Sequence, residues 1–159
     1  MSKLQLLLET LGTSALLFGL ASVAMHWAEL PAIIAVHFGI TGQPDGMGPK
    51  EVLAFLATIS VFMYITFSIA TRNPQKANVP WPITDENRQE IMHLVKCLLV
   101  AVKTEICLMF GYLFYVMVQC GLGRMSGLHW SFAPIFITVV FASIGVFYYA
   151  GRRFRKSAQ

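Results

Sequence analysis

Four long apolar runs constrain the fold of this chain more than any other feature. They cover roughly residues 4–25, 52–70, 97–118 and 132–150. Each run is close to the about 20 residues that an α-helix needs to cross a hydrocarbon core about 30 Å thick. Backbone polar groups in lipid must be satisfied within the protein, so only helices and closed barrels can span. None of the runs alternates as a barrel strand does, and we therefore predict four membrane-spanning helices.

The composition points to the same class of protein. Charged residues make up 13% of the chain and hydrophobic residues 56%, whereas soluble domains average roughly 25% charged residues. This is too little polar side chain to solvate a globular surface. We predict an all-α integral membrane protein in which residues 1–159 form a single membrane domain, a four-transmembrane-helix bundle with up-down-up-down topology.

The distribution of basic residues orients this bundle. Eight lysines and arginines fall on one side of the predicted membrane, and Lys50 and Arg124 fall on the other. The larger group consists of Lys3, Arg72, Lys76, Arg88, Arg152, Arg153, Arg155 and Lys156. Short loops rich in Lys and Arg stay in the cytoplasm. We therefore predict a multi-pass membrane protein with cytoplasmic N- and C-termini and a cytoplasmic loop 71–90.

Loops 27–51 and 119–131 then face outward. The basic residues lie mainly between the apolar runs and at the C-terminus rather than on one soluble face, so we expect membrane lipids, and no nucleic acid, as their partner. Four glycines in or near the runs are expected to let helices approach closely. These are Gly12, Gly19, Gly111 and Gly145.

The first outer loop carries the most informative motif. Its segment 42–46, GQPDG, has the composition of a tight turn, because Pro presets φ, Asp bonds its own backbone and Gly tolerates a positive φ. One interpretation is that the motif only fixes the shape of the loop. The other is that His37, Phe38, Asp45 and Lys50 form a binding site for a ligand, ion or peptide from outside, with Phe38 pinning the loop to the apolar phase.

Three histidines are weak candidates for a metal site. His26, His37 and His129 share the outer rim in the predicted topology, together with Glu29 and Asp45. Imidazole suits zinc and copper. The spacing matches no known ligand motif, and His26 and His129 each adjoin a tryptophan, as residues at a membrane interface do. We therefore predict no cofactor.

Charged residues inside the apolar runs are a second candidate site. A charge at the centre of a spanning helix costs about 2.5–3.5 kcal/mol and is usually paired. Lys96 and Lys103 share a helical face, whereas Glu105 points elsewhere and is a poor partner for Lys103. Glu9 in the first run is the candidate partner for Lys96 or Lys103. Such a pair fixes the helix register, or the group relays a proton, an ion or a signal.

The chain also resembles a known family. The resemblance rests on residues 27–31 (WAELP), the pair HF at 37–38, the segment 42–46 with Gly48, and Lys50. It continues loosely through residues 73–74, 84–88 and 99–106. These motifs are similar to the small membrane domain of unknown function that begins the SdpI-type immunity proteins. The resemblance implies protection against a secreted toxic peptide and sequestration of a repressor at the membrane.

Three functions follow from these observations. We do not expect an enzyme, because the sequence has no Walker loop, nucleophile elbow or Rossmann fingerprint. The preferred hypothesis is a multi-pass immunity or sensor-like protein of the bacterial cytoplasmic (inner) membrane that recognises an extracellular peptide, such as a peptide toxin. An alternative is an accessory or assembly subunit of a larger membrane protein complex. A second alternative is a small ion-coupled transporter, which with four spans would need to form a homo-oligomer to enclose a pathway.

Overall fold

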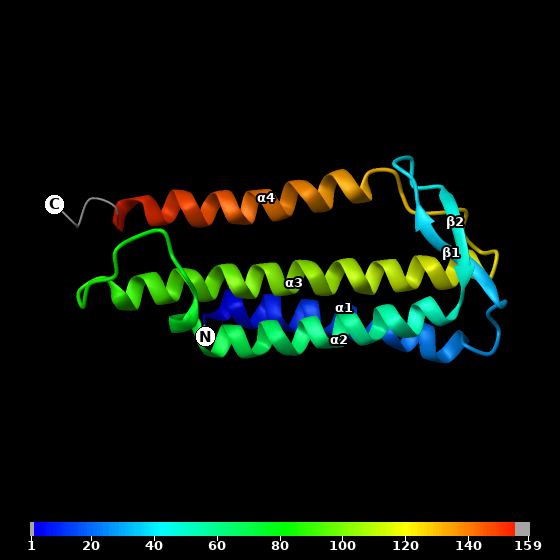
Figure 1. Cartoon of the computed structure of the whole chain (residues 1–159), viewed down its shortest axis with the longest axis horizontal. Coiled ribbons are helices and arrows are strands. Elements are labelled where there is room, and N and C mark those ends of the chain that lie inside the picture. The colour runs from blue at the N-terminus through cyan, green and yellow to red at the C-terminus, as the bar shows by residue number, and fades with distance from the viewer. Residues whose placement is uncertain (1, 155–159) are drawn as a thin grey trace.

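A computed structural model describes residues 2–154 of the chain (Figure 1). Its elements are α1 (Lys3–His26), β1 (Ile33–Phe38), β2 (Pro44–Pro49), α2 (Glu51–Arg72), a 3-10 turn (Pro74–Lys76), α3 (Arg88–Gly121) and α4 (Phe132–Gly151). Within residues 2–154, four helices are long and apolar enough to cross a membrane, which confirms the four predicted spans by length and composition. Arg155 and Lys156, two of the orienting residues, lie outside the described part.

The elements place distinct features at the two ends of the molecule. The start of α1, the end of α4 and the segment 73–87 lie at one end, which we call the terminal end (Figure 1). The β1–β2 hairpin and the connection 122–131 lie at the other, which we call the hairpin end. This arrangement agrees with the predicted topology. Which end faces the cytoplasm stays a prediction.

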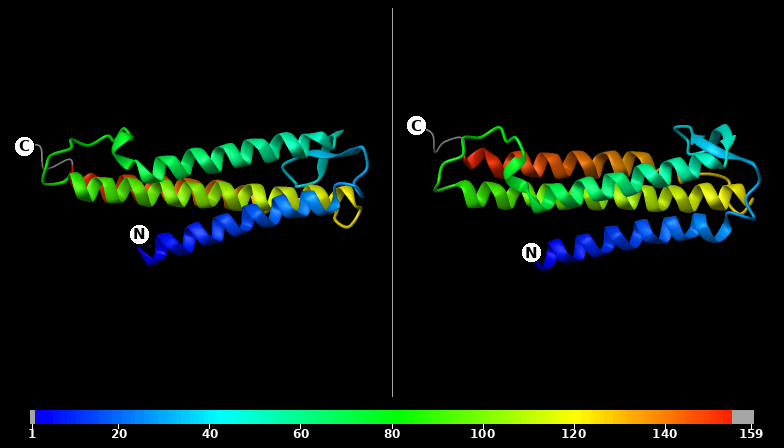
Figure 2. Two further views of the ribbon diagram at one scale, coloured as in Figure 1. Left: turned by 90° about the horizontal axis from the view of Figure 1, so that it is seen from below. Right: turned by 60° about the horizontal axis from the view of Figure 1, so that its bottom comes forward.

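α3 is the central helix. Among the described residues, every extensive contact between helices includes α3. α1 and α2 pack on one side of it, and α4 lies on the other (Figure 1, Figure 2). In the apolar windows of these helices, 44% of α3 is buried within the protein but only 6% of α4. The helices are therefore arranged around α3 rather than as four equal neighbours of a bundle.

α1 and α3 run parallel and approach each other most closely at glycines. A Cβ atom added to Gly19 would lie 2.7 Å from the Cα of Gly111, and one added to Gly12 would lie 3.0 Å from the Cα of Thr104. The contacts recur every seven residues, as Gln5 with Cys97, Gly12 with Thr104, and Gly19 with Gly111. A seven-residue repeat keeps one seam of each helix against the other. The predicted close approach at these glycines is confirmed.

Gly145 does not behave as predicted, and the difference gives a test. A Cβ on Gly111 would lie 2.3 Å from the carbonyl oxygen of Ala15, whereas one on Gly145 would meet nothing within 4 Å. Gly111→Ala should therefore destabilise the protein by about 1–3 kcal/mol, because the backbones must separate. Gly145→Ala should be neutral or stabilise it by up to about 1 kcal/mol through helix propensity. SDS titration of the protein in detergent micelles measures both free energies of unfolding, and equal effects would contradict the α1–α3 contact.

The hairpin makes the all-α prediction incomplete. β1 and β2 are antiparallel, with Ile34 opposite Gly48 and His37 opposite Gly46. The pairing is irregular between Ala35 and His37. β-branched residues in β1 (IIAVHF) favour a strand, but glycine and proline dominate β2 (PDGMGP), and both are depleted in strands. The composition of β2 therefore predicted only a loop.

The chain reverses at residues 39–43. The Gly39 N–H donates to the carbonyl of Gln43 at 2.9 Å, and the Gly42 N–H donates to the carbonyl of Gly39 at 2.8 Å. Gly42 has a φ of +82°, which strains any residue with a side chain. The tight turn predicted at 42–46 is thus misplaced, because Pro44 and the two residues after it belong to β2.

At the terminal end, the segment 73–87 closes the gap between α3 and α4. The buried ring of Trp81 packs on Phe147 of α4, with the ring centroids 5.0 Å apart. Ile91, Val95 and Phe154 complete this cluster. Arg153 donates a hydrogen bond to Glu90 at 2.8 Å across the same end. α4 is thus held near α3 by contacts at its C-terminal end.

Candidate functional site

Lys50 fastens the hairpin to the end of α1. Its ammonium donates hydrogen bonds to the carbonyl oxygens of Trp27 at 2.9 Å and Leu30 at 3.2 Å. It also lies 5.1 Å from the centroid of the Trp27 ring. The last carbonyls of a helix lack intrahelical partners and carry partial negative charge, so a cation stabilises them. The sequence placed Lys50 in the ligand-binding set, but its partners lie within the chain.

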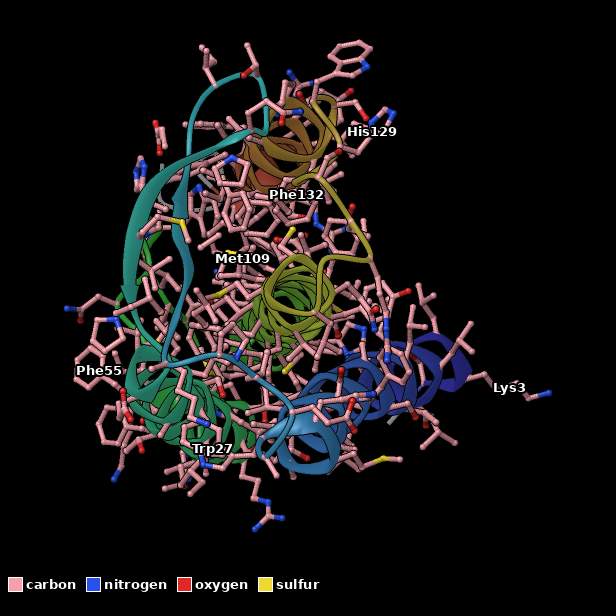
Figure 3. The ribbon with its side chains drawn as sticks, turned by 90° about the vertical axis from the view of Figure 1, so that its right-hand side faces the viewer. Lys3, Trp27, Phe55, Met109, His129 and Phe132 are labelled. Atoms are coloured by element: carbon pink, nitrogen blue, oxygen red, sulfur yellow. The ribbon has the colours of Figure 1, made fainter. Side chains whose placement is uncertain are left out.

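The tip of the hairpin rests on the connection between α3 and α4. The Leu128 N–H donates to the carbonyl of Gly42 at 2.8 Å. The approach is so close that a Cβ on Gly127 would lie 2.4 Å from the same carbonyl oxygen. Figure 3 shows the hairpin reaching from the α2 side of the molecule to the α4 side. Sequence reasoning missed this contact, because it joins backbone groups that are far apart in the chain.

His37 and Asp45 lie side by side on the hairpin. Their Nδ1 and Oδ1 atoms are 2.5 Å apart, and the side chains are 73% and 52% exposed. Exposed ion pairs contribute about 1 kcal/mol or less, so this one is not needed to hold the strands together. Phe38 is half-buried and packs against the core cluster of the bundle. Of the predicted ligand-binding set, His37 and Asp45 are therefore the residues open to a partner.

The three histidines do not gather around a common point. Among residues 2–154, no group of three or more His, Cys, Asp or Glu side chains is placed to hold a metal ion. His26 Nδ1 lies 3.0 Å from the carbonyl oxygen of Ser22, and His129 Nδ1 lies 2.8 Å from the hydroxyl of Ser131. Each histidine thus has a neighbour of its own, and no shared metal site results.

A closed polar site lies between α1, α2 and α3. The Lys103 ammonium forms an ion pair with Glu9 and donates a hydrogen bond to the Ser68 hydroxyl at 3.3 Å. The Tyr64 ring centroid is 5.0 Å from the same ammonium. The structure thus pairs Glu9 with Lys103, whereas Lys96 makes no ion pair within the part of the chain described. A buried charge is tolerated when such partners surround it.

The effects of substituting Glu9 and Lys103 on the free energy of unfolding should be strongly coupled in a double-mutant cycle. Lys103→Met leaves the Glu9 carboxylate unpaired and should cost about 3–5 kcal/mol, as breaking a buried pair does. The double variant Glu9→Gln/Lys103→Met removes both charges and should recover much of that loss. Free energies of unfolding from SDS titration measure the cycle. Additive losses would show that the two residues do not interact in the folded protein.

Glu105 occupies the opposite face of α3. Its side chain is 7% exposed, and its Oε1 accepts a hydrogen bond from the Ser143 hydroxyl of α4 at 2.5 Å. Its Oε2 is buried and has no hydrogen-bond partner among the described residues. As its separation of two residues from Lys103 predicts, it does not join the Glu9–Lys103 site. α3 therefore carries one closed polar site and one incomplete site.

Sequence reasoning missed the uncharged groups of these sites. Tyr64 and Ser68 lie four residues apart on the apolar helix α2, and Ser143 lies on α4. Residues four apart on a helix share one face. That spacing is a signal that could have identified the Lys103 partners. A single serine in an apolar run, as in α4, gives no such signal.

Comparisons with known proteins support a domain of unknown function over part of the chain and no finer assignment. A family described as a domain of unknown function, DUF1648, matches residues 15–61, which contain the hairpin. A stretch of 84 residues is 30% identical to an uncharacterized protein of Archaeoglobus fulgidus. That match covers 43% of this chain and 46% of the relative, so the chain spans about half of the relative's length. No solved structure matches. Neither match refers to SdpI-type proteins, and that part of the resemblance stays a prediction.

Proposed function

We propose that this protein is a non-enzymatic membrane protein of the immunity or sensor type, which recognises an extracellular peptide at its hairpin end. The observation that carries the proposal is a hairpin fixed at its base by Lys50 and at its tip by Leu128, with His37 and Asp45 exposed on it. Loops held by a rigid scaffold often carry binding. The family match over residues 15–61 includes this whole element.

The charges at the hairpin end favour a cationic peptide. Three carboxylates and two basic side chains lie in the connections 27–51 and 119–131, namely Glu29, Asp45, Glu51, Lys50 and Arg124. Lys50 bonds the backbone carbonyls of Trp27 and Leu30, and Arg124 lies 3.8 Å from Glu29. Asp45 and Glu51 are both exposed and remain to face a partner. Complementary charge speeds encounter and excludes wrong partners.

Exposed apolar side chains near these acids would bind the apolar part of such a peptide. Ile33, Ile40 and Met47 are all exposed, with Ile40 94% exposed at the turn. Met47 follows Asp45 by two residues, so both side chains lie on the same face of β2. An amphipathic peptide with basic and apolar residues therefore fits this surface better than a small ion does.

The proposal requires the hairpin end to face outward. Single cysteines at Ile40 and at Lys76 test this in a background where the native cysteines are replaced by serine. A membrane-impermeant maleimide applied to intact cells should label Ile40→Cys, because the hairpin end is outside. It should label Lys76→Cys only after the membrane is permeabilised. The reverse pattern would invert the topology and end the proposal.

Protection from a toxic peptide tests the function itself. A sensitive bacterium would express the wild type, the His37→Ala/Asp45→Ala variant or His129→Ala. The cells would then be exposed to a panel of purified secreted cationic peptides. For the recognised peptide, cells with the wild type or His129→Ala should survive clearly better than cells with an empty vector. The double variant should lose this protection. Equal survival of wild type and double variant at equal expression, or no protection by the wild type from any peptide, would refute the proposal.

The two alternative functions, an ion-coupled transporter and an accessory subunit, require different features of the protein. Lys103 is enclosed by Glu9, Ser68 and Tyr64, so this pair does not supply the exchangeable charged group that an ion-coupled transporter needs. That arrangement favours a structural role for the pair. An accessory subunit should copurify with a second protein in mild detergent. The proposed function instead predicts isolation of the protein alone or as a homo-oligomer.

A further inference from the structure

An apolar cleft of about 280 Å³ separates the middle of α3 from α4. Glu105, Met109 and Tyr112 line it from α3, and Phe132, Ile135 and Phe136 line it from α4. Figure 3 shows Met109 and Phe132 on facing sides of the space between the two helices. The cleft lies on the far side of α3 from the Glu9–Lys103 pair, and no step of the proposed peptide recognition uses it.

Glu105 gives this cleft a buried carboxylate that lacks a partner for one of its oxygens. It is the one carboxylate of the cleft, and its buried Oε2 has no hydrogen-bond partner among the described residues. The nearest buried cation on α3, Lys103, is already paired with Glu9. An unpaired buried charge is costly, and a bound counter-charge removes that cost. The cleft is therefore complementary to a ligand with a positive group.

The aromatic lining narrows the class of ligand. The ring centroids of Tyr112 and Phe132 lie 4.7 Å apart, and those of Phe132 and Phe136 lie 6.2 Å apart. Aromatic faces attract cations, and they suit organic ammonium groups in particular. Metal ions prefer several oxygen, nitrogen or sulfur ligands, which this apolar cleft does not offer. An organic cation with an apolar body fits both the carboxylate and the rings.

We propose that the α3–α4 cleft binds a lipophilic organic cation, with its ammonium group at Glu105 and its apolar body against the aromatic rings. A second cavity of about 390 Å³ is lined by Ser143 and shares Val139 with the cleft, which leaves room for a longer apolar chain. α4 is the least buried of the four spans, so a ligand dissolved in lipid reaches the cleft from the side.

Binding of a radiolabelled probe tests the proposal. The full chain is purified in dodecyl maltoside micelles, which carry no ammonium group, and titrated with phenylbutyltrimethylammonium. Its uncharged isostere, in which carbon replaces the nitrogen, is titrated in parallel. The wild type should bind the cation saturably and the isostere at least about tenfold more weakly, a difference of about 1.4 kcal/mol. Glu105→Gln should weaken cation binding by a similar factor, whereas Glu86→Gln, at an exposed carboxylate of the terminal end, should not.

A second variant keeps the test decisive if Glu105→Gln does not fold. Ile135→Trp fills the cleft from α4 but leaves the carboxylate in place, and it should also abolish saturable binding. Equal binding of cation and isostere, or wild-type binding by Glu105→Gln, would overturn the proposal. Two further results would overturn it. In the first, the cation does not bind and a phospholipid copurifies with the protein in equal amount. In the second, the cation does not bind and the chain forms a dimer that Ile135→Trp dissociates. Those two results would assign the cleft to a lipid or to a second copy.

Discussion

The close contact between the backbones of α1 and α3 is the interaction on which the rest of the structure depends. Helices in lipid gain little by exchanging hydrocarbon for another apolar surface, so close van der Waals packing must hold them together. Gly19 and Gly111 provide that packing, and the Thr104 hydroxyl adds a hydrogen bond to the carbonyl of Leu8 at 3.0 Å. The seven-residue seam then fixes the axial register of the two helices. That register sets Glu9 beside Lys103.

The central position of α3 separates two kinds of polar site. On the side of α1 and α2, partners from both helices surround the Lys103 ammonium. On the side of α4, one oxygen of Glu105 is bonded to Ser143 and the other has no partner within the described residues. A buried charge with partners stabilises one arrangement of helices. A buried charge without partners costs free energy, which a bound ligand of complementary charge would lower. The Glu9–Lys103 site and the Glu105 site therefore differ in role, although both lie on α3.

The hairpin end divides the predicted binding residues by function. Lys50 and Phe38 are used within the fold: Lys50 bonds backbone carbonyls at and just after the end of α1, and Phe38 packs against the core. His37 and Asp45 remain exposed, because the strand register directs both to the outer surface. A recognition element of this kind needs both groups of residues. The first group holds the hairpin in place, and in the proposed function the second group contacts the partner.

The sequence by itself determined the four spans, because helix length and apolar composition are properties of each segment alone. It also determined that Lys103 needs a partner and that Glu105 faces elsewhere, because the cost of a buried charge and the helical period are local. It did not reveal β2, since that strand depends on pairing with β1 rather than on its own composition.

The tertiary structure decided what depends on the placement of one helix against another. The choice of Lys103 over Lys96 as the partner of Glu9 follows from the axial offset of α1 and α3, which the glycine contacts set. The α3–α4 cleft exists because, among the described helices, α4 packs mainly on α3, and Trp81 contacts it near its C-terminal end. Neither the axial offset of α1 and α3 nor the separation of α3 and α4 can be predicted from one run of residues, because both depend on how two helix surfaces fit together.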